Sequence, residues 1–400
     1  MPDTVDALDL ADGCRLAVVA EGDDLAAVPM VRDSDGWRRA VPGDGAAAAL
    51  LELIAGQHGP LSRGNFRIRP WASRRAVGER PMGVDQTNES VVVGDVAVVK
   101  WATHLQEGPH PAPSRITALN QAGFTGMPAP WGLITWSRAD ADETVVAYVD
   151  EFLPDAVDGW TWAVDLVTGA ARGEDPATLA ATITDVGSLI ADMHAALPAS
   201  ASHASPDDAA RWHRQALDTL EIACDLTDSM SGQVLRTHRD AVAAELACLG
   251  DLAGMPVLDG HGDLHVGQIL RSGNRLVVTD FDGNPVLPAA QRILPIPAVL
   301  DVAGMAQSLA HVSVVARKYA TLDTGALAAV ETAVRTTFLD AYQHRLAALG
   351  YARLFDARPL PAFRLQQVMR EMIYAARHLP RWMYVPDSAL PALLDEGASS

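Results

Sequence analysis

The stretch VLDGHGDLHVGQILRSGNRLVVTDFDGNP, residues 257–285, places acidic and polar side chains between short apolar runs. Asp263 and Asp280 supply two carboxylates, each in a short loop beside a β-like run. The linking segment QILRSGNRLVVTD predicts a tight hairpin with its turn at SGN. Because a hairpin brings its two ends together, we expect Gln268 to lie near Asp280, where the two can hold a metal ion.

These residue types suit phosphoryl transfer, a reaction that asks the protein for few groups. A carboxylate must accept the proton of the attacking hydroxyl, oxygen ligands must hold magnesium against the phosphates, and a cation must position the phosphates. Asp263 and Asp280 can supply the carboxylates, and Gln268 can supply a further oxygen ligand beside Asp280. A β-hairpin with merely polar turn residues is the alternative. It leaves the two histidines and the acidic pair around Phe281 unexplained.

The composition limits the partners of the chain. Its formal net charge of −19 repels nucleic acid and anionic lipid, so we expect neither nucleic acid nor a membrane as a partner. The three cysteines are far apart and odd in number, which fits neither a disulfide framework nor a zinc site. Together with an acidic N-terminus that lacks the regions of a signal peptide, this indicates a cytoplasmic protein. We expect a monomer or a weak homodimer.

Lysine is rare in this chain. It contains only two lysines, Lys100 and Lys318, whereas arginine is plentiful. A lysine that persists against such a bias is a candidate for a site that needs a compact charge on a flexible stem. Lys318, within SVVARKYATL, is interpreted as a solvated surface residue. Lys100 ends the β-like run VAVVK and is the better candidate.

Three parts are expected along the chain. Residues 1–85 form a cap subdomain with the β-like runs CRLAVVA and AAVPMVR and the helical segment AAAALLELIAGQ. Its last stretch, 60–85, is rich in Arg, Pro and Gly and predicts an irregular connection. Residues 86–154 form an N-lobe, in which β-branched runs around Gly94-Asp95 predict a hairpin. A short helix and the strands PWGLITWSR and TVVAYVDEFL follow, which predicts a small antiparallel sheet with one helix.

The third part, residues 155–400, is mostly helical by its pattern. Ala- and Leu-rich stretches with helical periodicity cover about 160–197, 205–250, 299–320, 325–349 and 361–378. The β-like insert quoted above lies between the second and the third of them. A small β-rich lobe followed by a helical lobe with one loop–strand insert predicts an α+β, bilobal fold.

The insert resembles a known family. HGDLHVGQ followed by DFD resembles the catalytic loop and metal-binding motif of aminoglycoside-phosphotransferase-like kinases, distant relatives of protein kinases. The resemblance implies a protein-kinase-like fold, ATP and Mg²⁺ as cofactors, Asp263 as catalytic base, and Gln268 and Asp280 as metal ligands. Gln268 stands where Asn is commoner.

The same resemblance implies which residues bind the nucleotide. It places Lys100 against the α- and β-phosphates. The usual Gly-rich phosphate loop is missing, and DQTNESVVVG stands in its place. Further nucleotide contacts are expected from this loop and from the end of the last N-lobe strand: Thr87, Asn88, Ser90, Glu151 and Leu153. No helix acid that pairs with Lys100 is evident. Glu107 is the nearest alternative, and the role stays unassigned.

Within these kinases the chain is similar to the maltokinase group and its relatives, the bacterial glucosamine kinases. The resemblance covers most of the chain and includes TNES, DEFLPDAVDGW, TDFDGNP, DVAGM and EMIYAARHLPRW. Maltokinases carry basic and Ser-Pro residues where this chain has RILPIPAVL, and a second Glu where it has Ala375. These changes thin the polar lining of the sugar site, which points away from a disaccharide. We therefore expect glucosamine, converted to glucosamine 6-phosphate.

Four residues of the helical lobe are expected to line the acceptor pocket: His265, Asp301, Glu371 and Trp382. Carboxylates suit a positively charged amino sugar, and Trp382 can stack on a sugar face or act as a cation–π partner. The alternatives are that Asp301 caps a helix, Glu371 faces solvent and Trp382 lies in the core. His194 resembles the helix histidine of the family and is expected to be a hydrogen-bonded structural residue.

Other functions stay open at this point. The acceptor can be maltose, giving maltose 1-phosphate, or an aminoglycoside or another small molecule. The alternative outside the enzymes is a regulatory pseudokinase. The intact set of Lys100, Asp263, Gln268 and Asp280 argues against it.

Overall fold

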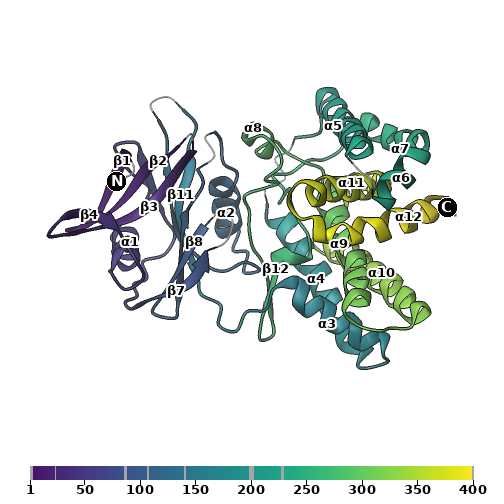
Figure 1. Ribbon diagram of the computed structural model, residues 1–400, viewed down its shortest axis with the longest axis horizontal. Helices are drawn as coiled ribbons and strands as arrows, with labels where there is room; N and C mark the ends of the chain where they lie inside the picture. Colours follow the sequence, from purple (N-terminus) through teal and green to yellow (C-terminus); the bar gives the residue numbers. More distant parts are fainter. Residues whose placement is uncertain are drawn as a thin grey trace. The chain divides into compact units, whose positions relative to one another are not determined.

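The computed structural model describes residues 3–22, 24–84, 88–105, 108–138, 141–197, 202–226 and 229–398. The chain forms two compact units (Figure 1). The β-rich unit comprises Met1–Ala156 and Asp280–Leu294, and the helical unit comprises Val157–Thr279 and Pro295–Ser400. The α+β class predicted from the sequence is confirmed. The three-part division at residues 85 and 154 stays a prediction.

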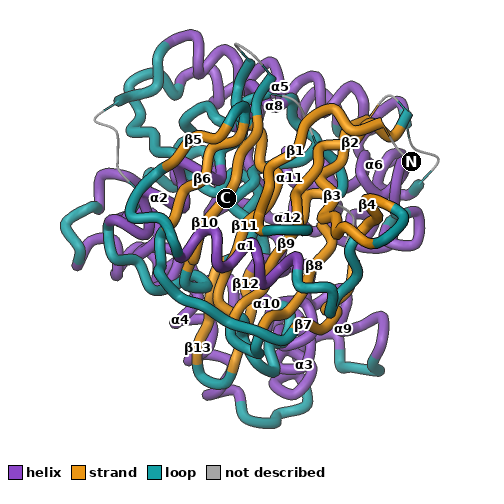
Figure 2. Tube along the Cα trace, turned by 90° about the vertical axis from the view of Figure 1, so that its left-hand side faces the viewer, coloured by secondary structure: helices purple, strands orange, loops and turns teal. Residues whose placement is uncertain are grey.

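Two antiparallel sheets build the β-rich unit (Figure 2). The four-stranded sheet has the order β1-β2-β3-β4, with β1 (Asp3–Ala11), β2 (Cys14–Glu21), β3 (Asp24–Asp33) and β4 (Gly36–Arg39). The seven-stranded sheet has the order β5-β6-β10-β11-β9-β8-β7. Its strands are β5 (Leu61–Arg63), β6 (Phe66–Pro70), β7 (Glu79–Val84), β8 (Asn88–Val93), β9 (Ala97–Ala102), β10 (Pro130–Trp136) and β11 (Thr144–Glu151). This sheet therefore takes strands from both sides of residue 85.

The hairpin predicted around Gly94-Asp95 is confirmed as β8 and β9. Val99 and Trp101 of β9 lie in the core, because alternate residues of a strand point to the same face. Asp95 has a φ of 52°, a left-handed conformation that Asp tolerates in a tight turn. The alternation places Lys100 on the face opposite that core.

The irregular connection predicted for residues 60–85 is wrong, because β5, β6 and β7 lie there. In β6 Phe66 and Ile68 are buried, whereas the guanidinium of Arg67 lies 3.3 Å from the Glu143 carboxylate at the surface. The alternation of apolar and basic residues in FRIRP is a strand signal. The Gly, Pro and Arg residues around it concealed that signal.

The described part of the β-rich unit also contains helices α1 (Ala46–Ala55), α2 (Ala112–Gln121) and α8 (Ala289–Arg292). Helix α1 contacts strands of both sheets. Its Leu50 and Ile54 belong to the same hydrophobic cluster as Leu16 of the first sheet and Trp101 of the second. The two sheets therefore share one core, which supports the strand that carries Lys100.

The helical unit consists of helices joined by short loops (Figure 1). Its helices are α3 (Gly159–Ala171), α4 (Pro176–Ala196), α5 (Pro206–Asp225), α6 (Met230–Thr237), α7 (Arg239–Leu246), α9 (Ala298–Tyr319), α10 (Thr324–Ala348), α11 (Leu360–His378) and α12 (Tyr384–Ala398). Its 3-10 turns are η1 (Ala247–Asp251), η2 (Val266–Gln268), η3 (Ala352–Leu354) and η4 (Pro380–Trp382), and its hairpin is β12 (Ile269–Ser272) with β13 (Arg275–Val278).

The predicted helical stretches are confirmed, with two differences. The stretches 160–197 and 205–250 are divided into shorter helices. Gly173, with a φ of 81°, follows the end of α3, and the Asp175 side chain caps α4. Helix α12 was not predicted, because Pro391 lies inside it and proline normally breaks a helix.

Helix α9 is the core helix of the helical unit. It packs against α3, α10, α11 and α12. Among the described residues it is the one helix long and apolar enough to cross a membrane, and 89% of its most apolar window is buried inside the protein. A helix that is apolar all round is expected where other helices surround it.

Candidate active site

The HGD loop, residues 261–263, is held by Asp301 of α9. The Asp301 carboxylate accepts hydrogen bonds from the backbone N–H groups of His261 (2.7 Å) and Gly262 (2.8 Å). Asp301 is fully buried, and Nε2 of His194 lies 3.3 Å from its Oδ2. Burial raises the pKa of Asp301, but the hydrogen bonds from His194 and the loop outweigh it, so the pKa lies below its ordinary value. An ionised interior carboxylate thus fixes the loop.

Two glycines let the loop approach the helices around it. A Cβ at Gly304 of α9 would lie 2.4 Å from the carbonyl oxygen of Leu264. A Cβ at Gly159, which begins α3, would lie 1.6 Å from the carbonyl oxygen of Val266. No side chain fits at these distances. Packing therefore explains the glycines of the DVAGM and DGW segments, because they let α9 and α3 lie directly against the loop.

Asp263 lies partly buried on this loop. Its N–H donates to Nδ1 of His261 (3.3 Å), and Nε2 of His261 donates to the carbonyl oxygen of Thr279 (2.9 Å). The buried imidazole thus ties the loop to the end of β13. Burial lowers the pKa of Arg370 on α11, and the charge of Asp263 opposes this effect. Arg370 therefore lies near Asp263; sequence reasoning missed it because α11 is far from the loop along the chain.

The hairpin predicted after the loop is confirmed as β12 and β13, with Ile269 paired to Val278. The Thr279 N–H donates to the carbonyl oxygen of Gln268 (2.9 Å), so Gln268 lies beside the residue that directly precedes Asp280. Asp280 has a φ of 66°, a conformation that is uncommon outside glycine and that occurs at functional sites.

In the β-rich unit Lys100 contacts side chains of β11. Its Nζ donates to the Tyr148 hydroxyl (3.1 Å) and lies 3.7 Å from a carboxylate oxygen of Asp150. Burial lowers the pKa of Lys100, but Tyr148 and Asp150 outweigh it and the pKa is raised. The side chain keeps 26% exposure. Lys100 is therefore a fixed cation that can still be reached by a ligand.

Among the described residues, the acid that forms an ion pair with this lysine is Asp150 of strand β11. Helix α2 instead carries Arg115, which is 1% exposed and donates to the carbonyl oxygens of Phe281 (3.1 Å) and Arg292 (2.8 Å). The role of the helix acid stays unassigned, because Glu107 lies outside the described residues. Helix α2 thus holds the backbone of the DFD segment through the Arg115 side chain.

The DFD segment brings two carboxylates together. Burial, and then the charge of Asp280, raises the pKa of Asp282. Mg²⁺ is usually held by one or two carboxylates, with water and phosphate oxygens completing the octahedron. A pair of carboxylates that repel each other fits such an ion, so the segment suits magnesium. Among the described residues no group of three or more His, Cys, Asp or Glu is arranged to hold a metal.

The predicted phosphate loop is described only in part. Thr87 lies outside the described residues, and of Asn88 only the backbone at the start of β8 is described. Ser90 is the cross-strand partner of Lys100 in the β8–β9 pair. Directly opposed residues of neighbouring strands point to the same face. Ser90 and Lys100 therefore share the face that is expected to meet phosphate.

Glu151 and Leu153, the two nucleotide contacts predicted at the end of β11, have different surroundings. The Glu151 carboxylate accepts the N–H of Ala129 (3.1 Å), which joins β11 to the start of β10. Leu153 is 8% exposed. Their nucleotide contacts stay predictions.

Trp382 belongs to an aromatic cluster in the helical unit. Its ring is edge-on to Trp160, with centroids 5.2 Å apart, and it lies 5.9 Å from the ring of Tyr384. Trp160 is on α3, which packs against η2 of the catalytic loop. Trp382 is only partly buried, and its predicted contact with the sugar stays a prediction.

Glu371 lies on α11, next to Arg370 in the sequence. Its side chain is 19% exposed, and Oε2 lies 2.9 Å from Nδ1 of His311. Oε1 accepts a hydrogen bond from Nε2 of Gln367 (3.1 Å). The residue therefore does not lie on a solvated face, which was the alternative interpretation of the sequence.

The structure gives two predicted acceptor residues other roles. Asp301 is fully buried with loop N–H groups on both oxygens, so its side chain offers no surface to a sugar. Nδ1 of His265 accepts the N–H of Gly267 (3.1 Å), and its Nε2 lies 3.4 Å from the Gln268 amide nitrogen. His265 thus caps η2, and its predicted contact with the sugar stays a prediction. The sequence located both residues at the loop but could not give their side-chain directions.

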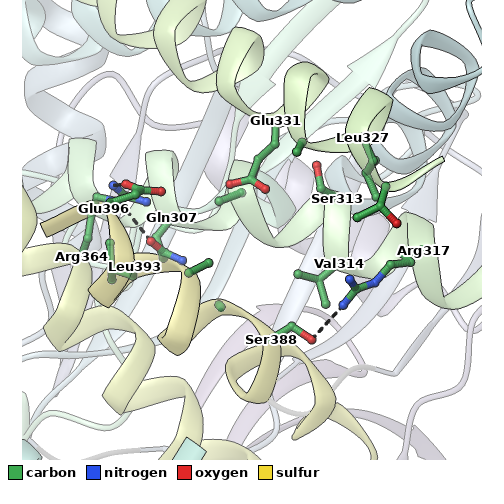
Figure 3. A pocket seen from close by; sticks show the side chains of 15 residues that line it. Gln307, Ser313, Val314, Arg317, Leu327, Glu331, Arg364, Ser388, Leu393 and Glu396 are labelled. Atoms are coloured by element: carbon green, nitrogen blue, oxygen red, sulfur yellow. Dashed lines mark hydrogen bonds and ion pairs between the residues drawn. The ribbon is translucent and has the colours of Figure 1, made fainter. Parts of the chain in front are cut away.

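A pocket of about 150 Å³ lies among α9, α10, α11 and α12 (Figure 3). Gln307, Arg364 and Glu396 meet at one end of it, and Arg317 donates to Ser388 at the other. None of the residues predicted for the active site lines this pocket.

A β-rich unit with a strand lysine and a helical unit with an anchored aspartate loop are the plan of a protein-kinase-like phosphotransferase, as the sequence predicted. No family model matches the chain. The chain is 62% identical over 399 residues to the glucosamine kinase of Mycolicibacterium smegmatis, with 99% of each chain covered. It is 45% identical over 400 residues to the glucosamine kinase of Streptacidiphilus jiangxiensis, with 97% of this chain and 90% of that one covered.

Solved structures agree with these sequences. A glucosamine kinase in complex with glucosamine, ADP and inorganic phosphate matches with a TM-score of 0.86 and 42% identity, over 98% of this chain and 93% of that chain. A second crystal form of a glucosamine kinase matches with a TM-score of 0.87. The chain belongs to the glucosamine kinase family.

Proposed function

We propose that this protein transfers the γ-phosphoryl group of ATP to glucosamine. The observation that carries the proposal is full-length similarity to glucosamine kinases together with the anchored Asp263 loop. The solved relative that binds glucosamine, ADP and inorganic phosphate supports the same substrate pair. The sugar hydroxyl that attacks is the 6-hydroxyl, giving glucosamine 6-phosphate.

Asp263 acts as the catalytic base. It orients the sugar hydroxyl and accepts its proton as the phosphoryl group transfers. Its position is supported by the Asp301 anchor and by the His261 link to Thr279. Arg370 supplies a positive charge near Asp263.

Lys100, Gln268 and Asp280 serve the nucleotide. Lys100 binds the phosphates as a compact charge, oriented by Tyr148. Asp280 and Gln268 would hold Mg²⁺, and the ion would supply positive charge against the phosphates. Asp282 gives the magnesium site a second carboxylate close to the first.

Glu371 binds the amino group of the sugar, and Trp382 packs against the sugar ring. A carboxylate that meets an ammonium in a partly desolvated pocket gains a charge-assisted hydrogen bond, worth about 1.5–3 kcal/mol. Glucose offers a neutral hydroxyl at that position and compensates the carboxylate poorly. Glucosamine is therefore preferred over glucose by about 10- to 100-fold in kcat/KM.

The test combines product identification with one variant. ³¹P and ¹³C NMR of the product should show a phosphate ester at the 6-position of glucosamine; an ester elsewhere would contradict the proposed hydroxyl. Glu371→Gln should lower kcat/KM for glucosamine much more than for glucose. An unchanged ratio in a folded variant would remove Glu371 from amine recognition, even with glucosamine as substrate.

A further inference from the structure

The pocket of Figure 3 contains no residue that the proposed function uses. It has a volume of about 150 Å³ and lies among α9, α10, α11 and α12 of the helical unit. A cavity of this volume can hold a molecule about the size of benzene. The pocket is therefore large enough for a small metabolite, and the side chains around it decide which kind.

One face of α9 forms a wall of the pocket. Four lining residues of this helix are spaced three or four apart and so lie on the same face: Ala310, Ser313, Val314 and Arg317. Ser313 is 3% exposed, and among the described residues its hydroxyl has no hydrogen-bond partner. Because burying a hydroxyl without a partner is costly, this position favours a ligand that can pair with it.

Arg317 brings a positive charge to the same wall. It lies four residues after Ser313, one turn farther along α9, and its side chain is exposed. Its guanidinium donates one hydrogen bond, at 3.2 Å, to the hydroxyl of Ser388 on α12, which also lines the pocket. A guanidinium has five N–H donors in a planar fork, so donors remain for the oxygens of a ligand. Arg317 and Ser313 can therefore donate to one oxyanion.

The beginning of α10 also reaches the pocket. Thr324, the first residue of this 25-residue helix, is one of the lining residues. The N-terminus of a helix carries a partial positive charge and favours an anion. The Asp323 side chain accepts the N–H of Ala326 (2.8 Å) and offsets part of that charge. Arg317 therefore supplies the main attraction for an anion.

Two carboxylates limit the charge that a ligand can carry. Glu396 lies at the end of the pocket opposite Arg317, where it is paired with Arg364 at 2.9 Å and Arg335 at 2.5 Å. Glu331 also lines the pocket, and its carboxylate lies 3.8 Å from Arg335. A ligand with a second negative charge would place that charge against these carboxylates. The pocket therefore favours a ligand with an anionic group at one end only.

We propose that this pocket binds a small molecule with a single oxyanion head group, a carboxylate or a phosphate ester, and a short apolar body. Arg317 and Ser313 bind the head group. The body packs against apolar side chains that include Leu327 of α10 and Leu393 of α12. The proposal goes beyond phosphorylation of the sugar, and its failure would leave the proposed function untouched, because no catalytic residue takes part.

Butyrate is the probe, because it carries one carboxylate and matches the pocket in size. Its binding is measured by isothermal titration calorimetry on the full chain saturated with ADP, Mg²⁺ and glucosamine, so that the catalytic site is filled. For a ligand of this size we expect a Kd on the order of 1 mM. Titration of n-butyl phosphate shows which of the two oxyanions binds more tightly. Butylamine and succinate should each bind at least about tenfold more weakly than butyrate.

A matched pair of variants locates the bound probe. Arg317→Gln should weaken butyrate binding at least about tenfold, because it removes the charged donor and keeps a side chain of similar length. Lys318→Gln removes the same charge at the next residue, which does not line the pocket, and should leave the Kd unchanged. The proposal is overturned if neither anion binds saturably, if butylamine binds more tightly than both anions, or if the two variants have the same Kd for butyrate.

Ser313→Ala separates ligand binding from stability. Since the hydroxyl has no partner among the described residues, its removal should leave the Tm of the ligand-free protein unchanged or raise it. The same change should weaken butyrate binding by about 3- to 10-fold. A hydroxyl with a purely structural role would do the reverse. A Ser313→Ala protein with a lowered Tm and the wild-type Kd for butyrate overturns the proposed head-group site.

Discussion

Asp301→Asn tests how the catalytic loop is held. The wild-type carboxylate accepts two short backbone hydrogen bonds, from His261 at 2.7 Å and from Gly262 at 2.8 Å. Asparagine keeps one acceptor oxygen and turns an N–H₂ group toward the other donor. The variant has nearly the same size and shape, so any effect comes from charge and hydrogen bonding.

The expected loss follows from those contacts. One charge-assisted hydrogen bond contributes about 1.5–3 kcal/mol, and a buried N–H without an acceptor costs about 1–3 kcal/mol. The sum of about 2.5–6 kcal/mol is a large part of a typical total of about 5–15 kcal/mol. At about 2–4 °C per kcal/mol for a domain of this size, the Tm should fall by about 5–24 °C.

Turnover should fall as well, because the loop carries Asp263. A displacement of about 1 Å in a reacting group can lower the rate about 100-fold. We expect a large loss of kcat with little change in the KM for ATP, measured by coupled ADP release at a temperature where the variant is folded. Asp192→Asn is the matched control, since its exposed pair with Arg345 should contribute little. An Asp301→Asn protein with wild-type Tm and kcat would refute the anchoring role.

Three further predictions concern the base, the phosphates and pH. Asp263→Asn should lower kcat by several orders of magnitude with little effect on ATP affinity; a loss under about tenfold, or ~1.4 kcal/mol, would remove Asp263 from the role of base. Lys100→Arg should raise the KM for ATP and lower kcat although it keeps the charge, because the planar guanidinium cannot replace a compact ammonium; wild-type kinetics would mean that Lys100 does not contact phosphate. Burial, opposed by Lys100, raises the pKa of Asp150 to about 6 from an ordinary 3.8, so this group stabilises the fold fully below pH 3.8 and that contribution is lost as the pH rises through 6. In the absence of nucleotide, Asp150→Asn should therefore remove part of the fall in Tm between about pH 4 and 6; identical pH profiles of Tm would contradict it.

The hairpins and helices of the site could be predicted because local pattern decides them. The β8–β9 hairpin has runs of valine on both sides of the turn at Gly94-Asp95, and β12–β13 has apolar residues on both sides of SGN. The strand β6 was missed because its two arginines and the surrounding Gly and Pro residues looked like a connection. This segment forms a strand because it pairs with its neighbours in the sheet and buries Phe66 and Ile68 in the core.

The side-chain partners could not be predicted, because they come from residues far apart in the sequence. Asp301 is on the helix that follows the loop, and only the fold shows that its carboxylate caps the loop backbone. Asp150 meets Lys100 across a strand pair, whereas the sequence was searched for an acid on a helix. His311 is an ordinary polar residue of a core helix until α11 brings Glu371 beside it.

The central claim is that this protein phosphorylates glucosamine at the expense of ATP. The most direct measurement is a coupled ADP-release assay that compares kcat/KM for glucosamine, glucose, maltose and an aminoglycoside, with Asp263→Asn as the inactive control. We expect Mg²⁺-dependent turnover with glucosamine preferred over glucose by about 10- to 100-fold, and weaker activity with the other two acceptors. A preference for glucose, maltose or the aminoglycoside, or ADP release that Asp263→Asn leaves unchanged, would contradict the claim.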